Sequence, residues 1–158
     1  MLKSTKSASE SGLCLQAEDL QCKPCEIVII SFDQKFATDE GAERLSKAVG
    51  KALGNKKFTF IDTTTPNEKE YILASPHAIN GLEFQAVILL GADEGRVPQT
   101  SGVSDISQHF IKYSSYNLLY LASSRAKYRL LLLGNKLNGV SSCLEHSLKS
   151  GHLMQEDC

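Results

Sequence analysis

Two short blocks in the second half of the chain contain the residues best suited to chemistry at a bound ligand. The first is Ser75–Phe84, with the sequence SPHAINGLEF. It contains His77 and Glu83, which could in principle act as acid and base, and a glycine that permits close approach of a ligand. The second block is Leu118–Lys127, with the sequence LLYLASSRAK. Its arginine, Arg125, presents a planar guanidinium that matches phosphate oxygens, as arginine fingers do in phosphoryl transfer.

Each of these residues also has a purely structural interpretation. On a helix, Leu118, Ala122 and Arg125 lie four and three residues apart, so the arginine shares a flank with apolar neighbours and must either extend to solvent or meet an anion. A lone arginine usually extends to solvent, and a lone Gly81 usually makes only a bend. The full string HAINGLEF, and the place of Arg125 near the end of a helix that leads into a strand, favour the functional interpretation.

The elements that must position both blocks alternate between strand-like and helix-like patterns. Ile27–Ile30 is a β-branched run without polar alternation, which is typical of a strand covered on both faces. Further strands are predicted at 58–61, 71–74, 86–90 and 129–133, and helices at 39–53, 114–127 and 141–149. This alternation predicts an α/β fold, a three-layer sandwich around a mostly parallel sheet. Because ligands bind beyond the carboxyl ends of such strands, the block that begins at Ser75 starts where a site is expected.

Length and composition bound the domain organisation. The 158 residues suit one domain with a single core. We expect the polar residues 1–24 to be disordered, residues 25–150 to form the domain, and residues 151–158 to be a tail. A formal charge of -1 argues against a domain that binds nucleic acid without the help of another domain, because such domains usually carry an excess of basic residues. Because no stretch resembles a bilayer span or a signal peptide, we expect an intracellular protein of the cytoplasm or nucleus, or of a bacterial nucleoid, with no membrane partner.

The candidate metal and redox ligands do not form a recognisable site. Five cysteines, an odd number in a chain without an export signal, indicate a reducing compartment. The pair Cys22 and Cys25 precedes a strand instead of opening a helix after one, so it lacks the context of a redox dithiol. No second closely spaced ligand pair accompanies these thiols, and no metal site is predicted. Asp93 and Glu94, in a turn flanked by glycines, are expected to be solvated.

Three tyrosines follow one another at helical spacing, just before and within the second predicted helix. They are Tyr113, Tyr116 and Tyr120. Their steps of three and four residues, with leucines between them, are typical of a packed helix face. We expect core or helix-surface positions for these side chains and not a platform for base stacking.

The two blocks resemble the last two signature motifs of the UvrD/Rep-like superfamily 1 DNA helicases. Those motifs read roughly T-x-H-x-x-K-G-L-E-F followed by G-x-x-E-G-x-x-P, and then L-L-Y-V-A-x-T-R-A. The corresponding strings here are SPHAINGLEF, GADEGRVP and LLYLASSRA. The resemblance covers roughly residues 27–133 and is specific in the two blocks. It implies a RecA-like fold, that of the second, C-terminal motor domain, without a phosphate loop of its own.

The resemblance also implies a role for each matching residue. Arg125 would be the catalytic arginine finger that reaches the γ-phosphate of ATP and stabilises charge during hydrolysis. Gly81 and Glu83 would face the nucleotide, with Glu83 near the ribose. Ser75 and His77 would contact single-stranded DNA and hold its phosphates. ATP with Mg²⁺ would be shared with a first RecA-like motor domain, in trans or in the intact protein, so no cofactor is expected to bind tightly to this chain alone.

Several positions depart from the family pattern. The lysine before the glycine is Asn80 here, which removes one positive charge, and the threonine before the signature arginine is Ser124. The upstream motif, a strand followed by an arginine that also touches ATP, has Ser31 at the arginine position, and Lys35 is a candidate substitute. No G-x-x-x-x-G-K-[ST] loop occurs in the chain, so the chain is not expected to hydrolyse ATP alone.

Two functions stay open on the sequence. The first is the C-terminal motor domain, or a fragment, of a UvrD-like ATP-dependent DNA helicase, which supplies the arginine finger and single-stranded DNA contacts to a separate ATP-binding domain. The second is a degenerate, non-catalytic helicase-like module that binds protein or nucleic acid. An unrelated α/β enzyme with its site at residues 75–83 is a third interpretation, but no nucleophile or metal partner accompanies that site.

Overall fold

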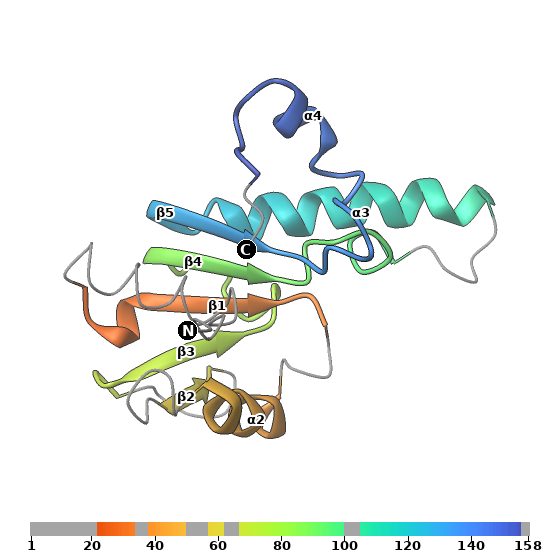
Figure 1. Ribbon diagram of the computed structural model, residues 1–158. Coiled ribbons are helices and arrows are strands. Elements are labelled where there is room, and N and C mark those ends of the chain that lie inside the picture. Colours follow the sequence, from red (N-terminus) through yellow and green to blue (C-terminus); the bar gives the residue numbers. More distant parts are fainter. Residues whose placement is uncertain (1–21, 34–37, 50–56, 62–66, 100–104, 156–158) are drawn as a thin grey trace, which may run out of the picture.

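The computed structural model describes residues 22–33, 38–49, 57–61, 67–99 and 105–155 (Figure 1). Nearly all of the segment predicted to be disordered, and the last three residues of the predicted tail, lie outside these ranges. The described chain begins at Cys22 and enters a short 3-10 turn, η1 (Pro24–Glu26), directly before the first strand.

Five parallel strands form the central sheet (Figure 1). They are β1 (Ile27–Ser31), β2 (Lys57–Phe60), β3 (Glu70–Ala74), β4 (Phe84–Leu90) and β5 (Ala126–Leu133), in the spatial order β2-β3-β1-β4-β5. Each neighbouring pair in this order is parallel. The chain winds from β1 toward β2 on one side and reaches β4 and β5 on the other, so the winding direction reverses between β1 and β4. The predicted α/β fold with a mostly parallel sheet is confirmed.

The central strand β1 is covered on both of its faces. Each of its five residues is buried. Val28 and Ile30 belong to one apolar cluster, whereas Ile27 and Ile29 belong to a second cluster on the opposite face. Successive side chains of a strand point to opposite faces. The run of β-branched residues therefore has no polar alternation because neither face of β1 meets water.

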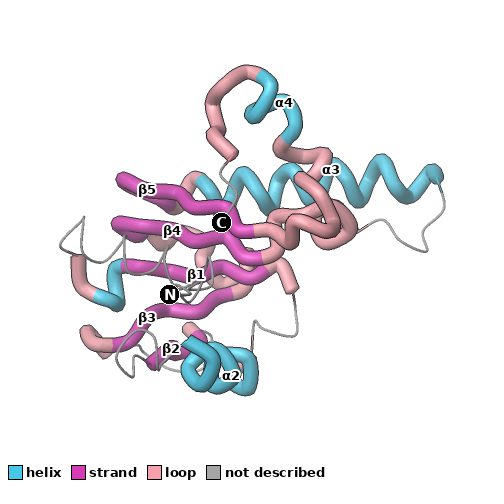
Figure 2. The backbone as a smooth tube through the Cα atoms, viewed as in Figure 1, coloured by secondary structure: helices cyan, strands magenta, loops and turns pink. Residues whose placement is uncertain are grey.

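Helices cover each face of the sheet, which makes three layers (Figure 2). Helix α2 (Asp39–Val49) contributes Ala42 to the cluster that contains Ile27, and Thr38 caps it by accepting a hydrogen bond from the Gly41 amide at 3.0 Å. Helix α3 (Asp105–Ser123) packs on the other face through Leu119 and Ala122. A short helix, α4 (Glu145–Lys149), follows β5. No described helix combines the length and apolarity that a membrane crossing requires.

Several element boundaries differ from those predicted. The helix predicted at 114–127 begins at Asp105 and ends at Ser123, and β5 begins at Ala126. Arg125 is therefore a turn residue and not a helical one, because the Phe84 amide donates to its carbonyl oxygen at 2.9 Å and draws the chain into the sheet. The last predicted helix begins only at Glu145. The end predicted for the first helix, beyond Val49, lies outside the described residues.

Candidate functional site

The first block runs from one edge of the sheet to the other. Ser75 follows Ala74 at the carboxyl end of β3, where Ala74 pairs with Ile30 near the end of β1. The end of the block, by contrast, leads into Phe84 at the amino end of β4. The block therefore begins at the carboxyl edge, where the sequence predicts the start of a ligand site, and it ends at the amino edge.

The two blocks meet at the amino edge of the sheet. Phe84 pairs with Ala126, the first residue of β5, so the turn that contains Gly81 lies beside the turn that contains Arg125. The structure therefore brings together the three residues that the resemblance assigns to the nucleotide. It separates them from the two residues that the resemblance assigns to DNA, Ser75 and His77.

The guanidinium of Arg125 points toward the Gly81 turn. Its Nη1 lies 3.5 Å from the carbonyl oxygen of Leu82, a long contact that nonetheless fixes the direction of the side chain. Its Nε donates to the Leu121 carbonyl at 3.2 Å, and its Nη2 to the Ser124 hydroxyl at 3.2 Å. These acceptors are neutral. In the described part of the chain no carboxylate forms an ion pair with Arg125, so its positive charge is not compensated there.

The turn itself depends on Gly81. The backbone of Gly81 has a φ of +79°, in the left-handed region that glycine occupies without steric cost. A Cβ built at this position would meet no atom within 4 Å, so open space lies in front of the backbone. Ile79, which is fully buried, anchors the turn to the core, and its carbonyl accepts a hydrogen bond from the Leu82 amide at 3.1 Å. An open, anchored glycine turn is suited to close approach by a ligand.

Glu83 and Lys127 link the two blocks electrostatically. The Lys127 ammonium lies 3.1 Å from a carboxylate oxygen of Glu83, and both side chains are about half exposed or more, at 47% and 62%. An exposed pair of this kind contributes little to stability. It does hold the Glu83 carboxylate on the same edge as Arg125. Lys127 was expected to be helical and instead belongs to β5.

Ser75 and His77 lie at the carboxyl edge. Ser75 is half-buried, His77 is exposed, and the Ala78 amide donates to the Ser75 carbonyl at 3.2 Å to close a turn. Among the described residues, no hydrogen bond or ion pair engages either side chain. Both side chains are thus available to an external ligand.

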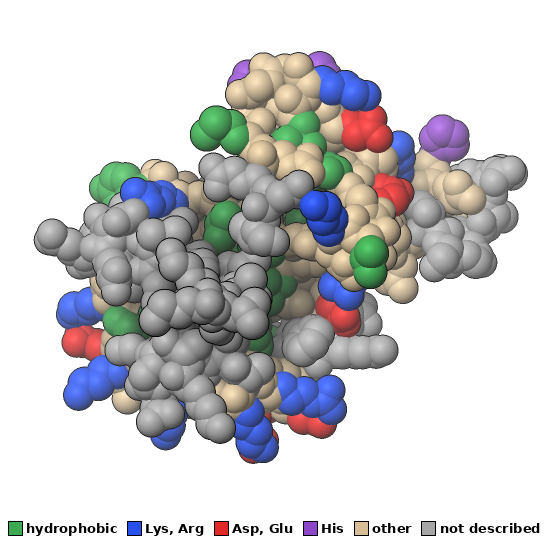
Figure 3. Space-filling model, viewed as in Figure 1, with side chains coloured by type: hydrophobic (Ala, Val, Ile, Leu, Met, Phe, Trp, Pro, Cys, Tyr) green, Lys and Arg blue, Asp and Glu red, His purple; other side chains and the backbone are tan. Residues whose placement is uncertain are grey.

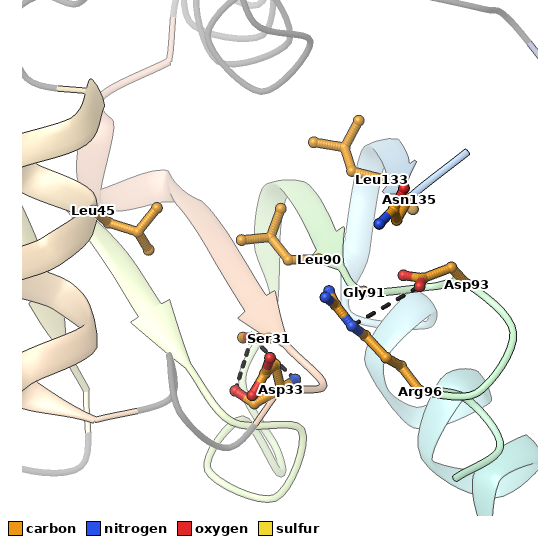
Figure 4. A pocket seen from close by; sticks show the side chains of 10 residues that line it. Ser31, Asp33, Leu45, Leu90, Gly91, Asp93, Arg96, Leu133 and Asn135 are labelled. Atoms are coloured by element: carbon orange, nitrogen blue, oxygen red, sulfur yellow. Dashed lines mark hydrogen bonds and ion pairs between the residues drawn. The ribbon is translucent and has the colours of Figure 1, made fainter. Parts of the chain in front are cut away.

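A cavity of about 370 Å³ opens at the same carboxyl edge, where the winding direction reverses between β1 and β4 (Figure 4). This is the place at which open α/β sheets commonly bind ligands. Its apolar wall is formed by Leu45, Leu90 and Leu133, and its polar part includes Asp93 and Arg96. Ser31, at the position of the missing family arginine, also lines it, whereas Lys35 lies outside the described residues.

Asp93 was set aside on the sequence as a solvated residue, and Arg96 was not singled out. Asp93 is 1% exposed, so the expectation that it is solvated is wrong. One of its oxygens accepts from the Asn138 amide and lies 3.8 Å from Nε of Arg96, while the other has no hydrogen-bond partner among the described residues. Gly91 makes room for this arrangement, because a Cβ there would lie 3.2 Å from Cδ of Arg96. The sequence feature that could have indicated this arrangement is Gly91, two residues before Asp93.

Glu94 has a structural role. Its carboxylate accepts a hydrogen bond from the Ser142 amide at 2.6 Å, and Ser141 donates through its hydroxyl to the carbonyl of Val97. These contacts fasten the segment after β5 onto the loop after β4. Glu94 is partly buried, whereas the sequence predicted a solvated side chain.

The thiols and histidines do not gather into a metal site in the described ranges, where no three His, Cys, Asp or Glu side chains are close enough to hold an ion. Cys22 and Cys25 do not form a disulfide with each other. Burial raises the pKa of the Cys22 thiol above its ordinary value, which makes it a weaker nucleophile at neutral pH.

The charged side chains on the face shown in Figure 3 are mixed in sign. Lysines and arginines lie among aspartates and glutamates, and on this face the described residues show no continuous basic strip. Nucleic-acid binding by a charged surface alone is therefore not supported there.

Comparison with solved structures finds a similar fold. The chain is similar to the crystal structure of the C-terminal domain of a possible DNA helicase from Lactobacillus plantarum WCFS1, with a TM-score of 0.59 and 24% sequence identity, over 85% of this chain and 67% of that chain. At this identity the likeness establishes a shared α/β fold. No family model and no curated protein matches the chain.

Proposed function

We propose that this chain is the second RecA-like motor domain of a UvrD/Rep-like ATP-dependent DNA helicase and works with a separate first motor domain that holds ATP and Mg²⁺. The observation that carries the proposal is the direction of the Arg125 guanidinium, which lies against Leu82 beside the open Gly81 turn. Leu82 and Arg125, which are 43 positions apart in the chain, thereby bring the two motifs together at one edge of the sheet.

Arg125 is suited to act as the arginine finger. Its contacts are two backbone carbonyls and one hydroxyl, so they orient the guanidinium without neutralising it. The side chain is half-buried, and charge interactions are stronger where water is partly excluded. If a companion domain presents the γ-phosphate of ATP, the oriented and uncompensated guanidinium would lie next to it. The guanidinium would then stabilise the negative charge that develops on the phosphate oxygens in the transition state.

The residues proposed to contact DNA and those proposed to face the nucleotide lie at opposite edges of the sheet, an arrangement suited to a motor domain. Ser75 and His77 contact single-stranded DNA at the carboxyl edge, while Gly81, Glu83 and Arg125 face the nucleotide at the amino edge. A single connection, residues 75–83, joins both groups and is anchored in the core by Ile79. A shift of this connection on nucleotide binding would move the DNA contacts, which is the coupling that translocation requires.

Reconstitution tests the proposal. The chain lacks a phosphate loop, so ATP hydrolysis stimulated by single-stranded DNA is expected only after a first motor domain with that loop is added. Arg125→Ala should reduce the reconstituted rate by about 10³-fold or more. Arg125→Lys should restore little, because the ammonium lacks the planar fork. Arg44→Ala, in an exposed pair with Glu40 on α2, is the matched control and should leave the rate unchanged. Equal rates for Arg125→Ala and the unchanged chain would count against the proposal.

A non-catalytic helicase-like module that binds protein or nucleic acid is the alternative function. Ser31 and Asn80, which remove two family cations, favour it. Single-stranded DNA binding measured between low and high salt, with and without ATP, separates the two functions. Binding that responds to salt and not to nucleotide supports the non-catalytic module.

A further inference from the structure

Helix α3 exposes an aromatic stripe on the side that faces away from the sheet. Phe110, Tyr113 and Tyr120 are 76%, 67% and 75% exposed, and Asn117 on the same side is also exposed. The tyrosines were expected in core or helix-surface positions, and they lie on the helix surface, because the core contacts of α3 come from other residues, such as Ala122. The side of a surface helix that faces water normally carries charged and polar residues, so exposed aromatic residues of this size mark an interaction surface.

The stripe is almost without charge. Between Ser107 and Ser123 the sequence contains no aspartate or glutamate, and Lys112 and His109 are the only basic residues. A nucleic acid or an anionic membrane surface is recognised through several cations, which this helix does not supply. Tyrosine and phenylalanine on an uncharged face are instead typical of protein interfaces. The chemistry therefore favours a protein with an equally uncharged, aromatic or aliphatic surface.

The spacing of the stripe points to a particular protein partner. Phe110, Tyr113, Asn117 and Tyr120 follow one another at steps of three, four and three residues, the spacing of a helix-pairing seam. This order of steps reads the same in both directions. A second helix that runs antiparallel therefore meets the same pattern, with Phe110 opposite Tyr120 of the other copy and Tyr113 opposite Asn117 of the other copy.

We propose that α3 pairs antiparallel with α3 of a second copy of this chain through this aromatic stripe. Charge does not oppose the arrangement, because the two Lys112 residues do not face each other in this register. The proposal is independent of the proposed function and uses none of the residues assigned to nucleotide or DNA.

The size of the stripe sets the expected strength. A fully covered aromatic side chain buries about 150–250 Å². Three of them bury on the order of 500 Å² on each copy, which is less than the roughly 800 Å² per partner of a standard stable interface. The pairing is therefore expected to be weaker than that of a standard stable dimer.

Sedimentation equilibrium over protein concentrations from about 10 μM to 1 mM tests the pairing. The unchanged chain should shift from monomer to dimer, and Tyr113→Glu should shift the midpoint at least tenfold by placing a charge in the seam. Tyr128→Glu is the matched control, since Tyr128 is 73% exposed on β5 and outside the stripe, and it should leave the midpoint unchanged. Far-ultraviolet circular dichroism confirms that each variant is folded.

A charge pair tests the antiparallel register. Tyr113→Lys alone should weaken the dimer, and adding Asn117→Glu in the same chain should restore it, because each lysine then faces a glutamate of the other copy. A chain that stays monomeric at 1 mM, or a dimer that survives Tyr113→Glu, overturns the proposal. So does a stripe that is covered only when another protein or a nucleic acid is added.

Discussion

Nη1 of Arg125 lies 3.5 Å from the carbonyl oxygen of Leu82, a residue 43 positions earlier in the chain. The contact places a guanidinium without a carboxylate partner among the described residues next to an open glycine turn. This contact forms because α3 ends at Ser123 and because the Phe84 amide donates a hydrogen bond to the Arg125 carbonyl, which pairs the following residues with β4. The termination of a helix therefore sets the position of the proposed arginine finger.

The left-handed backbone at Gly81 predicts a graded loss of stability on substitution. Gly81→Ala should lower the free energy of unfolding by about 1–2 kcal/mol, because a φ of +79° strains residues with a Cβ. Gly81→Asn should lose less and Gly81→Val more, since asparagine tolerates this conformation and β-branched residues do not. Urea denaturation measures the series. Equal stability for the three variants would mean that the turn relaxes and that its conformation does not depend on glycine.

The Glu83–Lys127 pair should be almost neutral for stability. Both side chains are substantially exposed, so Glu83→Gln should change the free energy of unfolding by at most about 0.5 kcal/mol. A double-mutant cycle with Lys127→Met measures the coupling. If Glu83 faces the nucleotide, the same Glu83→Gln change should weaken nucleotide binding by the reconstituted motor while stability stays constant. A loss of stability without any effect on nucleotide binding contradicts this assignment.

The buried carboxylate of Asp93 should be sensitive to truncation. Asp93→Ala removes the acceptor for Asn138 and the ionic partner of Arg96, and should cost about 1–3 kcal/mol of unfolding free energy. Asp93→Asn should cost less, because it keeps one oxygen and removes a buried charge whose second oxygen has no described partner. Glu40→Ala in an exposed pair is the control and should stay within about 0.5 kcal/mol. The thermal midpoint of each variant provides the comparison, and a normal midpoint for Asp93→Ala would show that the carboxylate has no structural role.

Cys143 should make stability fall at alkaline pH. Burial raises the pKa of its thiol above the ordinary value, although the interaction with the Ser141 side chain opposes this effect. The neutral thiol is thus favoured in the folded state, so its contribution to stability is present below an unfolded-state pKa of about 8.5 and is lost as the pH rises toward the folded-state value. Between pH 7 and 10 the unchanged chain should lose more unfolding free energy than Cys143→Ala. Parallel pH curves for the two proteins would contradict the assigned cause.

Much of the sheet could be predicted from the sequence, for identifiable reasons. Ile27–Ile30 is buried on both faces, so its hydrophobic run admits only a central strand. The Gly81 turn was also recognisable, because the glycine precedes a strand in a specific string. Both features depend on residues that are neighbours in the sequence, so a short stretch of sequence contains the information that predicts them.

What sequence reasoning missed depends on contacts between distant residues. The helix pattern of Leu118, Ala122 and Arg125 continues past the true end of α3, because the pairing of Phe84 with Ala126 stops the helix and no local signal reports it. Asp93 accepts a hydrogen bond from an asparagine 45 residues away. The cavity arises where the ends of three strands meet. No window of neighbouring residues contains that information.

The most direct test of the central claim is the affinity of the reconstituted two-domain motor for ADP with aluminium fluoride, an analogue of the transferring phosphoryl group, relative to ADP alone. If Arg125 reaches the γ-phosphate position, Arg125→Ala should lower the affinity for the analogue by at least about 100-fold and leave the affinity for ADP nearly unchanged. Arg44→Ala should change neither. The same ratio of the two affinities in Arg125→Ala and in the unchanged chain would contradict the account.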